Sequence, residues 1–212
     1  MRVLILGATG GTGRALTRQA RDRGHEVTAF VRSPQKLGPL AGHVTVRRGD
    51  PGSVKELRAI LPGHDAVLSA LGPPGPGPTT VLRTCARSLV DAMQTDGPRR
   101  LTVVSAAVLF EDLGVLGTLL RWTLLKNVAE DSAEMERIVM ASGLDWTIVR
   151  PPRLTNGPLT GRYQVGREHL PGRSATASIS RADVAHFVLD ELERSTQTHH
   201  IVGITGGKRG RT

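Results

Sequence analysis

Residues 3–14 of the chain read VLILGATGGTGR, in which an apolar, strand-like run breaks into Gly7, Gly10 and Gly13. In a nucleotide-binding turn, the first of these glycines makes the tight turn out of the strand. The second lets the backbone approach a pyrophosphate, and the third lets the next helix pack against the sheet. The phosphates would lie on the positive end of a helix that starts near Thr12. The alternative is a flexible loop, but the flanking strand and helix patterns favour a nucleotide-binding turn.

Strand-like and helix-like runs alternate along the rest of the chain, which predicts an α/β fold with a single Rossmann-like, doubly wound parallel sheet and helices on both faces. The expected strands cover residues 2–6, 26–31, 44–48, 65–70, 100–104, 145–149 and 199–204. The expected helices cover residues 13–23, 53–61, 79–95, 128–142 and 181–194. A chain of 212 residues suits one domain. We expect it over residues 1–205, with a flexible basic tail over 206–212.

The composition limits the class of partner. Lysine and arginine outnumber acidic residues by 28 to 19, but the arginines are scattered and aromatic residues make up only 3% of the chain. We therefore expect a basic surface and no nucleic acid partner. No apolar run approaches the ~18 residues that span a bilayer, and no leader pattern is present, so we expect a cytoplasmic protein without a membrane partner. We expect a monomer or a weak homodimer.

Cysteine and histidine usage points away from redox and metal chemistry of the chain itself. Cys85 is the single cysteine, which excludes an internal disulfide. It lies in a helical apolar pattern, so a buried, inert thiol is expected rather than a nucleophile. His199 and His200 have no carboxylate or cysteine at metal-ligand spacing, and no metal is predicted.

The residues after the second expected strand bear on the cofactor. An acidic residue about 20 positions past the glycines marks an NAD site, whereas an arginine there accommodates a 2′-phosphate. This chain has Arg32 at that place, with Lys36 beyond it and Arg14 just after the glycines. The pattern predicts NADP(H) in preference to NAD(H). The alternative for Arg32 is a solvated loop charge.

Further candidate residues follow the third, fourth and fifth expected strands. Asp50 could accept a hydrogen bond from the adenine amino group, or cap the helix that begins near Ser53. Leu71 and Gly72 would place backbone beside the nicotinamide ribose. The hydroxyl of Ser105 would point into the crevice near the reactive ring, or cap a turn.

Several of these motifs occur together in the order of a known family. The glycine turn, Val31-Arg32, Gly49-Asp50, Ser105-Ala106, Ser142-Gly143-Leu144 and Arg150-Pro151-Pro152 resemble the atypical short-chain dehydrogenase/reductase class, which carries an NAD(P)H-binding fold. Residues 151–163 and 179–187 are more specifically similar to the biliverdin-IXβ reductase, or flavin reductase, family. The resemblance implies a cofactor site formed by Gly7, Thr9, Gly10, Gly11, Thr12, Gly13, Arg14, Arg32, Lys36, Asp50, Leu71, Gly72, Ser105 and Pro152.

The chain departs from its relatives at the substrate side. Relatives commonly have a histidine after the two prolines, where this chain has Arg153, so Arg153 could face an anionic or electron-rich group of the substrate. The alternative is an ion pair with a local carboxylate such as Glu111 or Asp112. Many members of the class use a tyrosine followed four positions later by lysine as an acid, but Tyr163 is followed by Arg167. A conjugated acceptor can take a hydride without such an acid.

The segment 108–122 is apolar and too rich in glycine for one regular helix, so it could be a substrate lid, part of the core or a dimer contact.

Together, these patterns favour an NADPH-dependent reductase of a flat conjugated acceptor such as a flavin, a biliverdin-like or a quinone-like compound, with Ser105 and Arg153 at the reacting end. The rivals are a non-catalytic, NmrA-like sensor of NADP(H) and a carbonyl reductase or epimerase of the same superfamily.

Overall fold

The computed structural model describes residues 1–73, 75, 77–111, 113–123 and 125–207. Their main feature is an eight-stranded sheet with the strand order β3-β2-β1-β4-β5-β6-β10-β8. All neighbouring strands run parallel except β10 and β8, which are antiparallel. The strands of this sheet are β1 (Arg2–Leu6), β2 (Glu26–Val31), β3 (Thr45–Arg48), β4 (Ala66–Ser69), β5 (Arg100–Val104), β6 (Asp145–Arg150), β8 (Tyr163–Arg167) and β10 (His200–Gly206).

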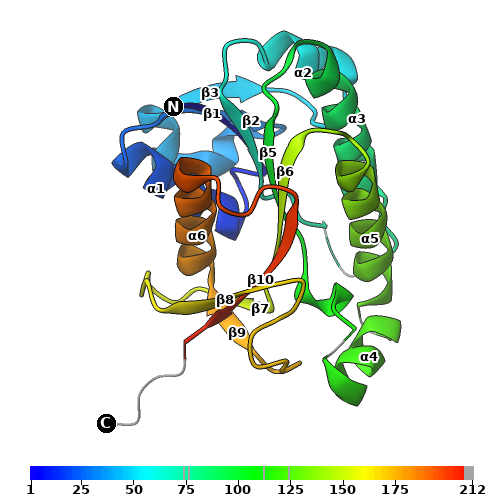
Figure 1. Ribbon diagram of the computed structural model, residues 1–212. Coiled ribbons are helices and arrows are strands. Elements are labelled where there is room, and N and C mark those ends of the chain that lie inside the picture. Colours follow the sequence, from blue (N-terminus) through cyan, green and yellow to red (C-terminus); the bar gives the residue numbers. More distant parts are fainter. Residues whose placement is uncertain (74, 76, 112, 124, 208–212) are drawn as a thin grey trace.

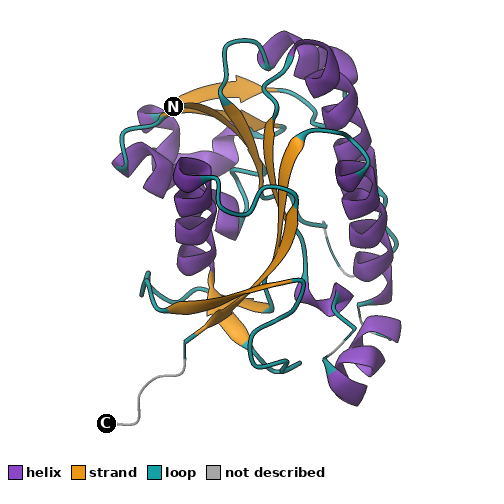
Figure 2. Cartoon of the chain, viewed as in Figure 1, coloured by secondary structure: helices purple, strands orange, loops and turns teal. Residues whose placement is uncertain are grey.

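Helices cover both faces of the sheet, as Figures 1 and 2 show. One face carries α1 (Gly11–Asp22) and α6 (Arg181–Arg194), which pack against each other. The other face carries α2 (Val54–Ile60), α3 (Val81–Asp96) and α5 (Lys126–Met140). This arrangement confirms the expected Rossmann-like, doubly wound α/β fold.

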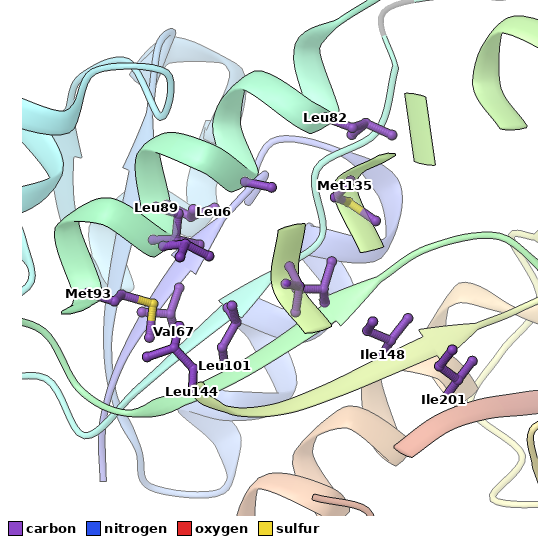
Figure 3. Packing of buried hydrophobic residues seen from close by; sticks show 14 of the residues in the cluster. Leu6, Val67, Leu82, Leu89, Met93, Leu101, Met135, Leu144, Ile148 and Ile201 are labelled. Atoms are coloured by element: carbon purple, nitrogen blue, oxygen red, sulfur yellow. The ribbon is translucent and has the colours of Figure 1, made fainter. Parts of the chain in front are cut away.

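The alternation of side chains along each strand builds two cores. Leu4 and Leu6 of β1 point to the α3 and α5 face, whereas Val3 and Ile5 point to the α1 and α6 face. Figure 3 shows the first core, where strand residues such as Ile148 pack against helix residues of α3 and α5. Because both faces are covered, the central strands are apolar at nearly every position.

The strand order creates a topological switch point between β1 and β4. The chain leaves β1 toward β2 on one side and enters β4 on the other, so a crevice opens beyond the carboxyl ends of these two strands. The glycine turn follows β1, and Ala70, Leu71 and Gly72 follow β4. The fold therefore brings the candidate residues of distant segments to one edge of the sheet.

Each expected strand and helix is confirmed, and each of their boundaries lies within two residues of the expected position. The structure adds short elements that the sequence pattern did not predict. These are the 3-10 segments η1 (Pro34–His43) and η2 (Ala107–Leu109), the helix α4 (Gly114–Trp122) and the strand β8. Two further short strands, β7 (Arg153–Thr155) and β9 (Ser178–Ser180), pair with each other. None of the described helices is both long enough and apolar enough to cross a bilayer.

Candidate functional site

The glycine turn between β1 and α1 has the geometry that its sequence predicts. Gly7 has a φ of +77°, and a Cβ atom on it would lie 2.5 Å from the carbonyl oxygen of Ala70. A Cβ atom on Gly13 would overlap the carbonyl oxygen of Gly7. A Cβ atom on Gly10 would meet, among the described atoms, only that same oxygen at 3.4 Å. The turn and the helix packing thus require Gly7 and Gly13, and the open side of Gly10 leaves room for a ligand.

The first turn of α1 presents unpaired donors at this place. The N–H group of Arg14 donates to the carbonyl of Gly10, at 2.8 Å, and begins the helical ladder. The three N–H groups before it, those of Gly11, Thr12 and Gly13, reach no acceptor within the described residues. Such groups and the positive end of the helix dipole favour an anion. The geometry fits a pyrophosphate, and its binding there stays a prediction.

An opening beside the turn is lined by Thr9, Leu71, Arg32 and Lys36. Gly72 follows Leu71 and is exposed. Both cationic side chains are also exposed, and neither forms a hydrogen bond or an ion pair within the described part of the chain. The structure therefore brings the two expected cations together at the end of β2, with their charges free for a phosphate.

Arg14 is engaged with backbone carbonyl groups. Its Nε donates to the carbonyl of Thr9, at 3.1 Å, and Nη1 donates to the carbonyl of Leu37, at 3.2 Å. Nη2 donates to the carbonyl of Lys36. These bonds tie η1, the segment that carries Lys36, to the glycine turn. Arg14 thus supports the site, and a direct contact with the cofactor stays a prediction.

Asp50 follows β3 and is exposed. Its Oδ1 accepts a hydrogen bond from the N–H group of Gly52, at 3.0 Å. The cap of α2 is Ser53, whose hydroxyl accepts from the N–H group of Glu56. The alternative that Asp50 caps this helix is therefore wrong, because Asp50 lies three residues too early and forms a turn of its own.

Ser105 follows β5 and joins a buried charged group. Its hydroxyl donates to Oε1 of Glu136, at 2.5 Å, and its N–H group donates to the carbonyl of Val149. Glu136 in α5 is only 1% exposed and forms a two-pronged ion pair with Arg150 at the end of β6, with N–O distances of 3.0 and 2.5 Å. The guanidinium of Arg150 lies 4.7 Å from the ring centre of Phe110.

This network fixes what Ser105 can do. Because its only hydroxyl proton goes to Glu136, the oxygen of Ser105 can accept a hydrogen bond from a ligand but has no proton to offer. Sequence reasoning missed Glu136 and Arg150 as members of the site. A glutamate on the buried face of an amphipathic helix was the available signal, since a buried carboxylate needs a cation.

A cavity of about 380 Å³ opens beyond the carboxyl ends of β5 and β6. Its walls come from η2, α4, the start of α5 and the loop after β8. They are mostly apolar, and they include Ala107, Leu113, Gly117, Pro152, Arg153 and Leu170. Because β5 stands beside β4 and β6 stands beside β5 in the sheet, the cavity continues the edge that starts at the glycine turn.

Arg153 is the cationic side chain at this cavity and is exposed. It forms no ion pair with Glu111 or with any other described carboxylate. Asp112, the second expected partner, lies outside the described residues. The arrangement favours a free cation at the mouth of the cavity.

The described residues of the segment 108–122 include most of η2 and all of α4, and they contribute to one wall of this cavity. Leu113 is buried there, whereas Leu116, Leu119 and Trp122 are 48%, 57% and 66% exposed. One face of α4 thus belongs to the cavity wall, and Leu116, Leu119 and Trp122 form an apolar stripe on α4 that is in contact with solvent.

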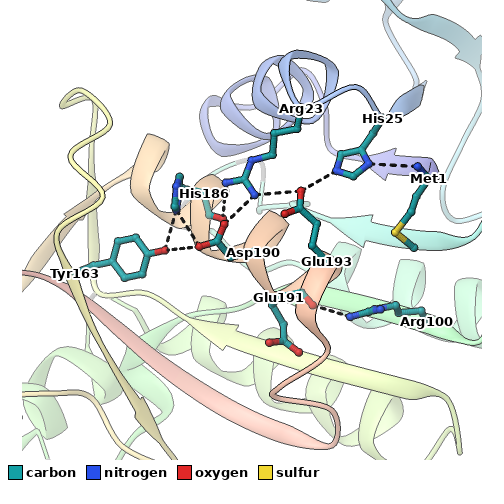
Figure 4. Close-up of polar contacts among 9 residues, drawn as sticks. All are labelled: Met1, Arg23, His25, Arg100, Tyr163, His186, Asp190, Glu191 and Glu193. Atoms are coloured by element: carbon teal, nitrogen blue, oxygen red, sulfur yellow. Dashed lines mark hydrogen bonds and ion pairs between the residues drawn. The ribbon is translucent and has the colours of Figure 1, made fainter.

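Tyr163 lies away from this cavity, on β8 against α6. Its hydroxyl contacts Nδ1 of His186, at 2.8 Å, and donates to Asp190, which pairs with Arg23 directly after α1 (Figure 4). Burial, followed by the Asp190 charge, raises the pKa of Tyr163 to about 12. Arg167, where relatives of the wider class have lysine, bonds instead to Gln197 and Thr196. Tyr163 therefore works as a structural contact between β8, α6 and α1.

A buried carboxylate also organises the loop that precedes β8. Asp183 accepts hydrogen bonds from the N–H groups of Thr160 and Gly161, at 2.8 and 2.9 Å, and from the hydroxyl groups of Thr160 and Ser180. Ser180 in turn caps α6. The two sequence motifs that contain these residues are thus in direct contact.

Cys85 is buried in α3, and burial raises its pKa to about 11, so the thiolate is absent at neutral pH. Within the described residues, no group of three His, Cys, Asp or Glu side chains is placed to hold a metal ion.

Comparisons with known proteins agree with this geometry. A family model described as NAD(P)H-binding matches residues 7–195. The uncharacterized sugar epimerase YhfK of Bacillus subtilis is 29% identical, over 98% of this chain and 95% of that protein. A 3-diazoavenalumate denitrifying reductase of Streptomyces is 34% identical, over 78% of this chain and 60% of that protein. A short-chain dehydrogenase/reductase of Veillonella parvula, solved with NADP, shares the fold with a TM-score of 0.81, at 21% identity over 99% and 95% of the two chains.

The fold and the open glycine turn are those of a Rossmann-like, dinucleotide-binding protein. The chain belongs to the NAD(P)H-binding family, whose model covers most of its length.

Proposed function

We propose that this protein is an NADPH-dependent reductase that transfers a hydride to a flat conjugated acceptor, such as a flavin, a biliverdin-like or a quinone-like compound. The observation that carries the proposal is the apolar cavity of about 380 Å³ on the same edge of the sheet as the glycine turn. An apolar cavity with few polar groups suits a flat, delocalised molecule. Arg153 at its mouth would hold an anionic group of that molecule.

The residues of the chain would act by binding and positioning. NADPH, when bound, supplies the hydride from its nicotinamide ring. The open N–H groups of α1 would hold its pyrophosphate, and the oxygen of Ser105 would accept from the amide of the ring. A conjugated acceptor draws its proton from water or from its own acidic groups, so alignment of the two rings supplies the rate enhancement.

One observation favours the non-catalytic sensor as a second candidate. The outer stripe of α4, formed by Leu116, Leu119 and Trp122, is an exposed apolar face of the kind that binds protein partners. An epimerase or carbonyl reductase has less support, because Tyr163 has no lysine beside it and is bound to His186.

The test of the proposal is a panel of acceptors. Purified protein is mixed with NADPH and either FMN, riboflavin, biliverdin or a quinone, and the loss of NADPH absorbance is followed. Saturable, enzyme-dependent loss with one or more acceptors supports the reductase. Tight NADPH binding without turnover on any acceptor would contradict it and favour the sensor.

We predict that NADPH binds more tightly than NADH, and that Arg32→Ala narrows the difference. Arg32 is exposed at the end of β2 without a described partner, so a 2′-phosphate would gain charge-assisted hydrogen bonds there. Their loss should cost roughly 1.5–3 kcal/mol of NADPH binding. Calorimetric titration of the unmodified protein and the variant with both cofactors measures the two affinities. The NADH affinity of the variant is the control, and it should stay unchanged. Equal dissociation constants in the unmodified protein would refute the preference.

We predict that Tyr163→Phe changes turnover little. The tyrosine hydroxyl contacts His186 and Asp190 on α6, and its pKa of about 12 keeps it protonated across the working pH range. Steady-state kinetics with NADPH and the best acceptor test this. A fall of turnover by several orders of magnitude at unchanged NADPH affinity would instead make Tyr163 a catalytic acid and support a carbonyl reductase.

A further inference from the structure

Arg181, the first residue of α6, reaches the glycine turn although 170 positions separate it from Gly11 in the sequence. A Cβ atom on Gly11 would lie 2.6 Å from Cδ and 2.7 Å from Nε of Arg181. The stem of the arginine therefore lies directly on the first residue of α1. A side chain at residue 11 would displace this arginine, so glycine at this position lets Arg181 lie against the start of α1.

The guanidinium of Arg181 is only partly engaged. Its Nη1 donates to Oδ1 of Asn156, at 2.7 Å, and more weakly to the carbonyl of Leu154, at 3.5 Å. Nε and Nη2 have no acceptor among the described residues, and no described carboxylate forms an ion pair with Arg181. Asp183, two residues further on, is fully used by Thr160, Gly161 and Ser180.

Two positive features thus stand side by side. One is the guanidinium of Arg181, and the other is the end of α1, with the unpaired N–H groups of Gly11, Thr12 and Gly13. Features of like sign at close range repel each other unless an anion lies between them. A phosphate group would satisfy both at once.

We propose that Arg181 is a further binding residue for the cofactor and contacts its pyrophosphate, with Asn156 holding the guanidinium in place. This inference rests on the proposed function in one respect, namely that the dinucleotide lies on the glycine turn. Arg181 then differs from Arg32 in what it recognises. The pyrophosphate is common to NADPH and NADH, whereas the 2′-phosphate belongs to NADPH alone.

The experiment compares dissociation constants of NADPH, NADH and adenosine 2′-monophosphate for the full chain and its variants. Arg181→Gln should weaken both dinucleotides by the same factor, about tenfold to a hundredfold, and leave adenosine 2′-monophosphate unchanged. Arg181→Lys should recover part of the affinity. Arg194→Gln removes the same charge from the exposed far end of α6 and should change none of the three constants. Thermal melting of the free variants controls for the fold.

Each outcome decides the inference. An equal loss for both dinucleotides, with adenosine 2′-monophosphate unchanged, supports it. Unchanged or tighter binding by a folded Arg181→Gln variant would overturn it, as would a loss confined to NADPH, which would assign Arg181 to the 2′-phosphate. If the unmodified protein bound neither dinucleotide, the proposed function itself would be wrong, and this inference with it.

Discussion

Gly10→Val is expected to abolish NADPH binding while the protein remains folded. Gly10 lies at the start of α1 with its outer side open, and the branched side chain would occupy the space next to the unpaired N–H groups. Loss of two or more charge-assisted hydrogen bonds raises the dissociation constant by at least about a hundredfold. Calorimetric titration with NADPH and circular dichroism of the free protein together measure the effect.

Two other glycines serve as controls for this variant. Gly42→Val changes an exposed glycine with no described atom within 4 Å of its Cβ position, so binding and stability should both be kept. Gly13→Ala should lower the melting temperature instead, because its Cβ would overlap the carbonyl oxygen of Gly7. If folded Gly10→Val protein retained the original NADPH affinity, the dinucleotide would have to bind elsewhere.

Arg150→Met is expected to destabilise the fold by about 3–5 kcal/mol. The substitution leaves the carboxylate of Glu136, which is 1% exposed, without its cation, and the hydrogen bond from Ser105 alone does not replace the two bonds from the guanidinium. Urea unfolding measures the change. The double variant Glu136→Gln/Arg150→Met should recover a large part of the loss, since no buried charge then stays uncompensated.

The matched control lies on α5, the helix that carries Glu136. Arg137→Met removes an exposed arginine that pairs with Glu134 on the surface of α5, and its effect on stability should be small. If Arg150→Met unfolded at the same urea concentration as the unmodified protein, the Ser105–Glu136–Arg150 network would not be a structural support of the site.

The sequence predicted the fold because its decisive signals are local. The apolar runs of β1, β4 and β5 are continuous, and each is followed by a helical pattern, which leaves a parallel sheet as the simplest arrangement. The strands β7 and β9 were missed because each has only three residues and no visible period. The helix α4 was obscured by Gly114 and Gly117, which a short helix against a cavity wall tolerates.

Site residues could be predicted from the sequence where the local backbone geometry requires one residue type. Gly7 and Gly13 follow from the turn itself, and both have the geometry expected there, while their contact with a cofactor stays a prediction. Glu136 and the proposed binding residue Arg181 do not follow from local geometry, because their contacts are with residues 31 and 170 positions away. The position of Asp50 in the sequence, shortly before α2, did not show whether its carboxylate caps that helix or accepts a hydrogen bond within the preceding turn, as it does from Gly52.

The most direct test of hydride transfer from NADPH to an acceptor in the apolar cavity is a single-turnover experiment without oxygen. The protein is loaded with NADPH, or with NADPH that carries deuterium at the transferred position of the nicotinamide ring, and mixed with increasing concentrations of the best acceptor. We expect a rate of NADPH loss that saturates with the acceptor and is slower with deuterium, because the bond to that hydrogen breaks in the measured step. NADPH that stays bound and unoxidised at every acceptor concentration would contradict hydride transfer to an acceptor in this cavity.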